Sequence, residues 1–225
     1  IVEKISPLNA RSKIINCDEQ VLMTDKPTDA IRLKKNSSMQ LSIDHVVSGK
    51  SNAILSCGNT GALMAISLLK LRTVASIKRP SIASIWPNIK GESIVLDLGA
   101  NIKNDTNSLI DNAILGSALA KVLFSMTEPS VGLLNVGIED MKGNENVQKA
   151  SEILSEMSNK KQLNYYGFVE GADISNGITN VIVTDGFTGN IALKTAEGTA
   201  LMVQSYFKKA FVSSLLSKLG YFFAS

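Results

Sequence analysis

The sequence has little of several features that mark specialised protein classes. Cys17 and Cys57 are its only cysteines, and neither belongs to a CxxC pair or a Cys/His cluster, which argues against a disulfide framework and a structural zinc site. Aromatic residues form 5% of the chain and do not alternate with basic residues, so the net charge of +3 does not indicate a nucleic-acid partner. No apolar run reaches the roughly 18 residues that a membrane-spanning helix needs. With no secretory-type start at Ile1, these features predict a cytoplasmic protein.

Short apolar runs alternate with amphipathic segments along most of the chain. The runs are Lys13–Cys17, Ala53–Cys57, Ser93–Leu98, Ser130–Val136, Tyr165–Val169 and Asn180–Thr184. They are nearly continuous in apolar character, as expected of strands that are buried on both faces. Between them, helical spacing is clear in Met39, Ile43, Val46 and Val47, and again in Val147, Ala150, Leu154 and Met157. The alternation predicts an α/β fold with a mostly parallel, doubly wound sheet, and the lack of a linker predicts one domain over residues 1–225.

The segment 204–225 has a different pattern. Its apolar residues cover about half of a helix circumference, and Lys208, Lys209 and Lys218 interrupt this wide arc. We therefore expect an amphipathic helix whose apolar face contacts either a second subunit or a membrane surface, with Lys218 and its neighbours near anionic headgroups in the second case.

Glycine and asparagine gather after four of the predicted strands. The loops are Gly58-Asn59-Thr60-Gly61, Gly99-Ala100-Asn101, the segment 137–144 with Lys142 and Asn144, and the segment 185–190, which begins with Asp185, ends with Asn190 and leads into a helix that carries Lys194. In a doubly wound fold, ligands bind at the carboxyl ends of the strands. Glycine allows the backbone to approach a ligand, and N–H groups at a helix start favour an anion. The four loops predict a polar cleft for a phosphate or a developing oxyanion.

Other residues that could carry chemistry have ordinary interpretations. His45 is the only histidine and lies near the end of a predicted helix, where a surface or capping role is favoured and no Ser-His-Asp triad can be assembled. Cys57 ends an apolar run, which favours a packed side chain over a nucleophile. Asp97 and Asp185 end strands, and each could position its loop or contact a ligand. No GxGxxG or GxxxxGK[ST] motif is present, so no nucleotide cofactor is predicted, and no metal site is predicted either.

Four longer motifs carry a family resemblance. They are SCGNTGALMA at 56–65, VLDLGAN at 95–101, VGLLNVGIEDMKGN at 131–144 and VTDGFTGNIALKTAEG at 183–198. In this order they resemble the bacterial phosphate acyltransferase family PlsX, and the segment 27–39 and Lys78-Arg79-Pro80 also match its pattern. The family's amino-terminal Asp-Ala-Met-Gly-Gly-Asp and its carboxy-terminal glycine-rich segment have no counterpart here, and Cys57 stands where alanine is more usual.

The resemblance implies a fold related to phosphotransacetylases and isocitrate-type dehydrogenases, and a homodimer. It also implies an acyltransferase of phospholipid synthesis, which converts acyl-acyl-carrier-protein and inorganic phosphate to acyl phosphate and free carrier protein. With the loops chosen from the residues and their ranking taken from the resemblance, Lys142 would bind phosphate and Asn190 would orient phosphate or the thioester oxygen. Asn59, Thr60 and Gly61 would form a backbone cradle. The supporting polar groups would be Asn101, Asn144, Asp185 and Lys194.

Three other functions stay open on the sequence. A phosphotransacylase that uses coenzyme A would need the same cleft chemistry. A membrane-surface scaffold without catalysis would account for the segment 204–225. A dehydrogenase is compatible with the fold class, although the dinucleotide fingerprint is missing.

Overall fold

The computed structural model describes residues 11–74, 77–102, 105–139 and 141–212. Contacts divide the chain into two compact units, Ile1–Pro80 and Ser81–Ser225, where the sequence predicted a single domain. Each unit has a hydrophobic core of its own. The two units are therefore described separately.

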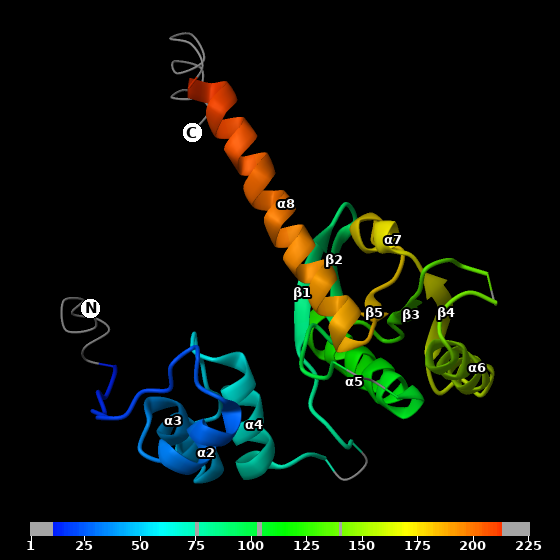
Figure 1. The fold of residues 1–225 in the computed structure, drawn as a ribbon. Coiled ribbons are helices and arrows are strands. Elements are labelled where there is room, and N and C mark those ends of the chain that lie inside the picture. The colour runs from blue at the N-terminus through cyan, green and yellow to red at the C-terminus, as the bar shows by residue number, and fades with distance from the viewer. Residues whose placement is uncertain (1–10, 75–76, 103–104, 140, 213–225) are drawn as a thin grey trace. The chain divides into compact units, whose positions relative to one another are not determined.

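The first unit is helical in its described part (Figure 1). Its helices are α2 (Pro27–Leu33), α3 (Ser38–Val47) and α4 (Thr60–Leu71). Proline fits the first turn of α2 because the first N–H groups of a helix have no intrahelical acceptor. Ser37 and Asn59 cap the next two helices through their side-chain oxygens. The core joins the three helices through Val21, Ala30, Met39, Ile43, Ala62 and Ile66.

Two of the predicted strands are wrong. Neither Lys13–Cys17 nor Ala53–Cys57 is a strand, and the strand-type pairing described in this unit is one isolated bridge between Glu19 and Ser37. A strand is stable only beside a partner that accepts and donates its backbone hydrogen bonds. The described residues supply no such partner, and Ile14 and Leu55 in these runs are 63% and 93% exposed.

The second unit contains a five-stranded sheet in the order β1-β2-β5-β3-β4 (Figure 1). The strands are β1 (Ala83–Asn88), β2 (Gly91–Leu96), β3 (Ser130–Leu134), β4 (Asn164–Val169) and β5 (Val181–Val183). The three pairings from β2 to β4 are parallel, as predicted, whereas β1 joins β2 in an antiparallel hairpin that the sequence did not predict.

Helices cover both faces of this sheet. They are α5 (Thr106–Phe124), α6 (Glu145–Asn159), α7 (Gly171–Asn176) and α8 (Gly186–Val212). Ile94 and Leu96 of β2 pack in one cluster with α5 and α6, whereas the intervening Val95 packs in another with Ile174 of α7 and Leu193 of α8. Successive strand residues point to opposite faces, so both faces are buried and the sheet is doubly wound.

The chain changes face between two neighbouring strands. β2 is followed by α5 on one face of the sheet, and its neighbour β5 is followed by α8 on the other. Adjacent strands with connections on opposite faces leave a crevice at their carboxyl ends, which is where ligands of such sheets bind. The fold therefore directs attention to the loops that follow β2 and β5.

Candidate active site

The loops after β2 and β5 are hydrogen-bonded to each other. The N–H of Thr184 donates to the Leu96 carbonyl at 2.7 Å, and the N–H of Asp97 donates to the Thr184 carbonyl at 3.1 Å. Further out, the N–H of Gly186 donates to the Asn101 carbonyl at 3.1 Å. The sheet pairing thus continues beyond the strands and fixes the first turn of α8 against the loop after β2.

Asp97 is the centre of the loop after β2. Its side chain is fully buried and accepts backbone hydrogen bonds from Gly99 and Ala100 at 3.1 and 2.9 Å and from Ile82 at 3.2 Å. Its second oxygen accepts from both the backbone N–H and the side-chain amide of Asn101, at 2.8 and 2.9 Å. Of the two roles that the sequence left open for Asp97, this geometry favours positioning the loop.

Asp185 has a comparable role at the start of α8. Its carboxylate accepts from the backbone N–H of Thr188 at 2.9 Å and from the Thr188 hydroxyl at 2.6 Å. This is the hydrogen bonding of a helix N-cap. The carboxylate therefore serves the backbone of its own loop.

Asn190 lies on the exposed side of the first turns of α8. Its side-chain amide donates to the Leu98 carbonyl at 3.4 Å, a long hydrogen bond to the loop after β2. Gly99 has a positive φ of 126°, and a Cβ there would come within 2.5 Å of the Asn190 amide nitrogen. Glycine at 99 therefore makes room for the asparagine, so the structure brings the predicted residues Asn101 and Asn190 to the same pair of loops.

The loop after β3 supplies the predicted lysine. Because β5 lies between β2 and β3, the loop after β3 flanks the other two at the same edge of the sheet. Asn135 holds it by donating to the Lys142 carbonyl at 3.1 Å and accepting from the N–H of Val136 at 2.9 Å. The Lys142 side chain is exposed, and none of the ion pairs between described residues includes it.

Three helices begin at this edge. The Thr106 hydroxyl at the start of α5 donates to the side-chain oxygen of Asn146 near the start of α6 at 3.2 Å, and α8 begins after β5. The amino terminus of each helix carries about half a positive elementary charge. Together with Lys142, these helix starts can attract and hold a phosphate dianion.

Two predicted site residues have other contacts. The Asn144 side-chain oxygen accepts from the N–H of Val147 at 3.0 Å and caps α6. Lys194 pairs with Glu197 at 2.8 Å on exposed α8. Eight residues beyond Gly186, it lies about 12 Å along the helix from its start, since each residue adds about 1.5 Å.

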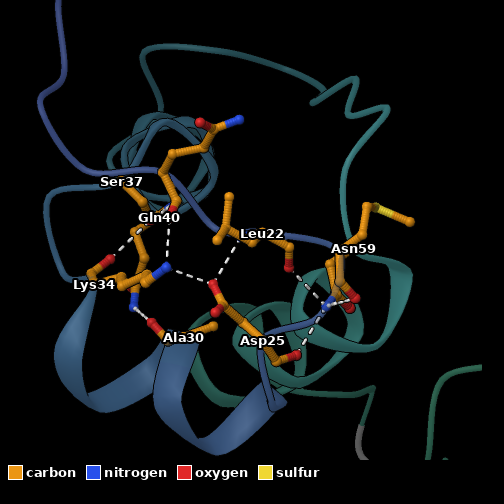
Figure 2. Close-up of polar contacts among 9 residues, drawn as sticks. Leu22, Asp25, Ala30, Lys34, Ser37, Gln40 and Asn59 are labelled. Atoms are coloured by element: carbon orange, nitrogen blue, oxygen red, sulfur yellow. Dashed lines mark hydrogen bonds and ion pairs between the residues drawn. The ribbon is translucent and has the colours of Figure 1, made fainter.

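The remaining predicted residues belong to the first unit (Figure 2). The Asn59 amide donates to the carbonyls of Leu22, Met23 and Asp25 at 3.1, 3.1 and 2.9 Å, while its oxygen accepts from the N–H of Ala62 at 3.0 Å. The Asn59 side chain is thus occupied in holding the segment 22–25 to α4. Thr60 and Gly61 are exposed at the helix start, so their backbone stays the predicted cradle.

A second set of contacts supports the same segment (Figure 2). Lys34 contacts Asp25 at 2.5 Å and donates to the Gln20 carbonyl at 2.7 Å, and the N–H of Leu22 donates to Asp25 at 2.7 Å. The hydrogen bond from Lys34, followed by that from Leu22, holds the pKa of Asp25 below its ordinary value. Buried Gln40 donates to the carbonyl of Ala30 at 3.1 Å, which closes the end of α2. The ammonium group of Lys34 is therefore used to hold the segment 20–25, whereas the side chain of Lys35 is exposed.

Asn135 was not among the predicted site residues, and the number of hydrogen bonds that Asp97 accepts was not predicted either. In the sequence, each of the two is a polar residue directly after an apolar strand. This pattern does not reveal which backbone groups the side chain will bind. Within the described ranges, no group of three or more His, Cys, Asp or Glu side chains could hold a metal ion, and no helix is long and apolar enough to cross a membrane.

Comparison with known sequences finds a family model and named relatives that match nearly all of the chain. A family model described as "Fatty acid synthesis protein" matches residues 1–225. A phosphate acyltransferase of Mesorhizobium japonicum is 50% identical over 222 residues, which cover 98% of this chain and 62% of that protein. A phosphate acyltransferase of Rhizobium rhizogenes is 48% identical over 225 residues, 100% of this chain and 64% of that protein. The chain thus spans less than two thirds of the length of these relatives.

Solved structures with a similar fold include two phosphotransacetylases. The EutD phosphotransacetylase of Staphylococcus aureus superposes with a TM-score of 0.55 at 20% identity, over 79% of this chain and 59% of that one. A phosphotransacetylase of Streptococcus pyogenes gives a TM-score of 0.56 at 19% identity, over 77% and 58%. At such identities the likeness establishes the fold, and it confirms the predicted relation to phosphotransacetylases.

Proposed function

Because the chain belongs to the fatty acid synthesis protein family, we propose that it forms the catalytic part of a phosphate acyltransferase. The proposed reaction takes an acyl thioester of acyl carrier protein and inorganic phosphate to acyl phosphate and free carrier protein. The observation that supports this proposal is that three loops and three helix starts lie at one edge of the sheet, and that one of these loops carries the exposed Lys142.

The chemistry suits such a site. A phosphate oxygen attacks the thioester carbonyl carbon, a C–O bond forms, and the C–S bond breaks when the tetrahedral intermediate collapses. The thiolate leaves with the electron pair and takes up a proton from water. The second pKa of phosphate is about 6–7, as for phosphate esters, and the pKa of a thiol is about 8.5. Neither the attacking phosphate nor the leaving thiolate therefore needs strong acid or base catalysis. Positioned N–H donors stabilise the oxyanion, and each is typically worth about 3–4 kcal/mol.

The proposed roles come from the family resemblance and from the loops on which the residues lie. Lys142 binds phosphate through its exposed ammonium group, and Asn190 orients phosphate or the thioester oxygen from the start of α8. Asn101 contributes from the loop after β2, where Asp97 fixes its amide. Thr60 and Gly61 lie on the first unit, where their exposed backbone remains a candidate anion cradle of that unit by itself.

The direct test mixes the purified protein with a fatty acyl thioester of acyl carrier protein and phosphate. Hydroxylamine converts acyl phosphate to an acyl hydroxamate, and a thiol reagent measures the free carrier protein. We expect both products to form in equal amounts and only when phosphate is present. Thiol release without phosphate would indicate a thioesterase and contradict the proposal. Faster turnover with acyl-coenzyme A would favour the coenzyme A-dependent alternative.

Lys142→Ala tests the phosphate site within the same assay. We expect turnover to fall at least tenfold, chiefly through weaker use of phosphate, while stability changes by less than about 1 kcal/mol because the side chain is exposed. Lys160→Ala is a matched control, because Lys160 is also exposed and lies at the opposite end of α6. An unchanged phosphate KM in Lys142→Ala would remove Lys142 from the site.

The far end of α8 supports a proposal about partners. In Figure 1 this helix extends well beyond the sheet. Its last described turns expose Phe207 and Val212 at 59% and 55%, and Phe211 stacks on Phe207 with ring centroids 6.3 Å apart. Exposed apolar surface of this kind marks a contact site. We propose that a second subunit or a lipid surface covers it; the rest of the segment 204–225, from 213 onward, lies outside the described residues.

Replacing Phe207 and Phe211 by glutamate distinguishes the two partners. If the variant becomes monomeric in sedimentation, the surface is a subunit interface. If it stays dimeric but no longer floats with anionic vesicles, the surface binds membrane. Retention of both properties would contradict the proposal. For comparison, Lys208→Ala changes the charge of the same turn without altering the apolar face.

A further inference from the structure

We propose that Asp97 is a positioning residue of the active site, which acts by fixing the side chains of Asn101 and Asn190. This inference rests on the proposed function for its link to catalysis. Asp97 itself is fully buried, so it does not reach a substrate in solution. Its effect passes through the residues that it holds.

The first observation is the completeness of its hydrogen bonding. Five N–H donors converge on its two carboxylate oxygens, and the four that follow it in sequence come from Gly99, Ala100 and Asn101, which supplies two. None of the ion pairs between described residues includes Asp97. A carboxylate only accepts hydrogen bonds and has about four lone-pair positions, which suits a ring of donors. An asparagine of the same size would instead place two N–H donors among these N–H groups.

The second observation is the orientation of Asn101. Its side-chain NH2 donates to Asp97 at 2.9 Å while its backbone N–H donates to the same oxygen at 2.8 Å. The same carboxylate oxygen therefore holds both the backbone and the side-chain amide of Asn101. The Asn101 carbonyl in turn accepts from Gly186 at 3.1 Å, which ties the loop to the start of α8.

The third observation is the link to Asn190. Asp97 holds the turn that contains Leu98, whose carbonyl accepts from the Asn190 amide at 3.4 Å. Gly189, the residue before Asn190, lies so close to the Asp97 carbonyl that a Cβ there would clash with it. Any displacement of the turn therefore moves both asparagines. Such a displacement matters because catalytic groups must be held within about 0.5 Å of their productive positions.

Asp97→Asn is the variant that tests this inference. It keeps the size of the side chain but replaces one acceptor oxygen by an NH2 group that faces N–H donors. With the purified protein in the acyl phosphate assay, we expect the phosphate KM to rise roughly tenfold or more, the effect of losing a hydrogen bond to a charged group. The KM for the acyl thioester is measured beside it, because Asn190 orients phosphate or the thioester oxygen.

A double-mutant cycle separates positioning from mere folding. If Asp97 acts through Asn101, then Asp97→Asn combined with Asn101→Ala should be hardly worse than Asn101→Ala alone. Multiplicative effects of the two changes would overturn the inference. Asp97→Ser, which is smaller and keeps one acceptor, replaces Asp97→Asn in the cycle if the latter does not fold.

Ser93→Ala is the matched structural control. Ser93 is buried within β2, the strand that precedes Asp97, and donates to the Thr179 carbonyl at 2.7 Å. Its loss should lower thermal stability without changing either KM. If Asp97→Asn behaves like Ser93→Ala, with reduced stability and unchanged phosphate KM, then Asp97 has only a structural role and the inference fails.

Hydrogen exchange makes the outcome independent of the proposed function. In Asp97→Asn, the amides of 99–101 and 186–190 should exchange faster, while those of β3 should not change. Unchanged exchange in the two loops would overturn the inference even if the wild-type protein makes acyl phosphate. Faster exchange in a protein that makes no acyl phosphate would keep the positioning network and reject the proposed function.

Discussion

Gly189 offers a sharp test of the close approach between α8 and the loop after β2. A Cβ at this position would lie closer than 3.0 Å to the carbonyl oxygen of Asp97 and 2.8 Å from the Thr184 side chain. That carbonyl belongs to a residue whose N–H donates to the Thr184 carbonyl, directly after β5, at 3.1 Å, so it cannot rotate aside as a side-chain end would. To accept even alanine, α8 must move away from the sheet.

The expected cost follows from this geometry. Overpacking a core by a methyl group typically costs about 1–3 kcal/mol, and contact with the main chain places Gly189→Ala at the upper end of that range. For a protein of about 150–250 residues, each kcal/mol lowers Tm by about 2–4 °C. We therefore expect Gly189→Ala to lower Tm by roughly 6–12 °C.

Gly198→Ala is the control on the same helix. A Cβ at Gly198 would meet nothing within 4 Å, and alanine is favoured over glycine in a helix interior by about 1 kcal/mol. Differential scanning calorimetry of both variants should give shifts of opposite sign. A Tm for Gly189→Ala equal to that of the wild type, or a shift that matches Gly198→Ala, would refute the close contact at the start of α8.

Three further predictions concern the metal, the first unit and pH. Turnover should be unaffected by excess chelator, and loss of activity restored by a divalent ion would overturn the mechanism. Asn59→Ala should destabilise the protein by about 2 kcal/mol in urea unfolding, and Asn59→Asp at least as much, because its carboxylate would face three carbonyls. Because the pKa of Asp25 is lowered in the folded protein, its carboxylate stabilises the fold above about pH 4, and this stabilisation is lost as the pH falls through the folded-state pKa. The urea midpoints of wild type and Asp25→Asn should therefore converge in acid. A difference that stays constant with pH would contradict this prediction.

The sheet of the second unit could be predicted because its central strands are buried on both faces. Ile94, Val95 and Leu96 are all buried, and such continuous apolar runs differ clearly from the helices between them. The hairpin strand β1 was missed because its burial alternates and it contains Trp86 followed by Pro87, a residue that is usual on edge strands only.

The runs Lys13–Cys17 and Ala53–Cys57 show the opposite error. Their composition is that of buried strands, yet composition does not supply the neighbour with which a strand pairs. The described residues leave Ile14, Ile15 and Leu55 exposed beside these unpaired backbones. A pattern of apolar residues thus predicts the conformation that a segment can adopt, whereas hydrogen-bonding partners decide whether it does.

The loops of the site were predicted by position but not by role. Asn59 and Asn144 each accept from the N–H three residues later, as helix caps do, and both stand directly before a helical pattern. Asn101 and Asn190 instead donate to Asp97 and to the Leu98 carbonyl, contacts between segments that are distant in sequence. Local sequence contains the information for a cap. Local sequence does not reveal which strands become neighbours, so the contacts of Asn101 and Asn190 could be seen only in the structure.

The glycines also differ in whether their position needs glycine, and this difference explains the glycine-asparagine pattern of the site loops. At Gly186 and Gly189 a Cβ would strike backbone atoms of the loop after β2, so glycine is required for the two loops to touch. At Gly171 and Gly198 a Cβ would meet open space. Glycine after β5 therefore serves close packing between neighbouring loops, and close packing is what brings Asn190 to the loop that Asp97 organises. The motif points to a site because the packing that needs glycine also sets the distance between the polar groups. It follows that substitutions at Gly186 and Gly189 should impair both stability and phosphate use, whereas a phosphate ligand such as Lys142 should affect phosphate use alone.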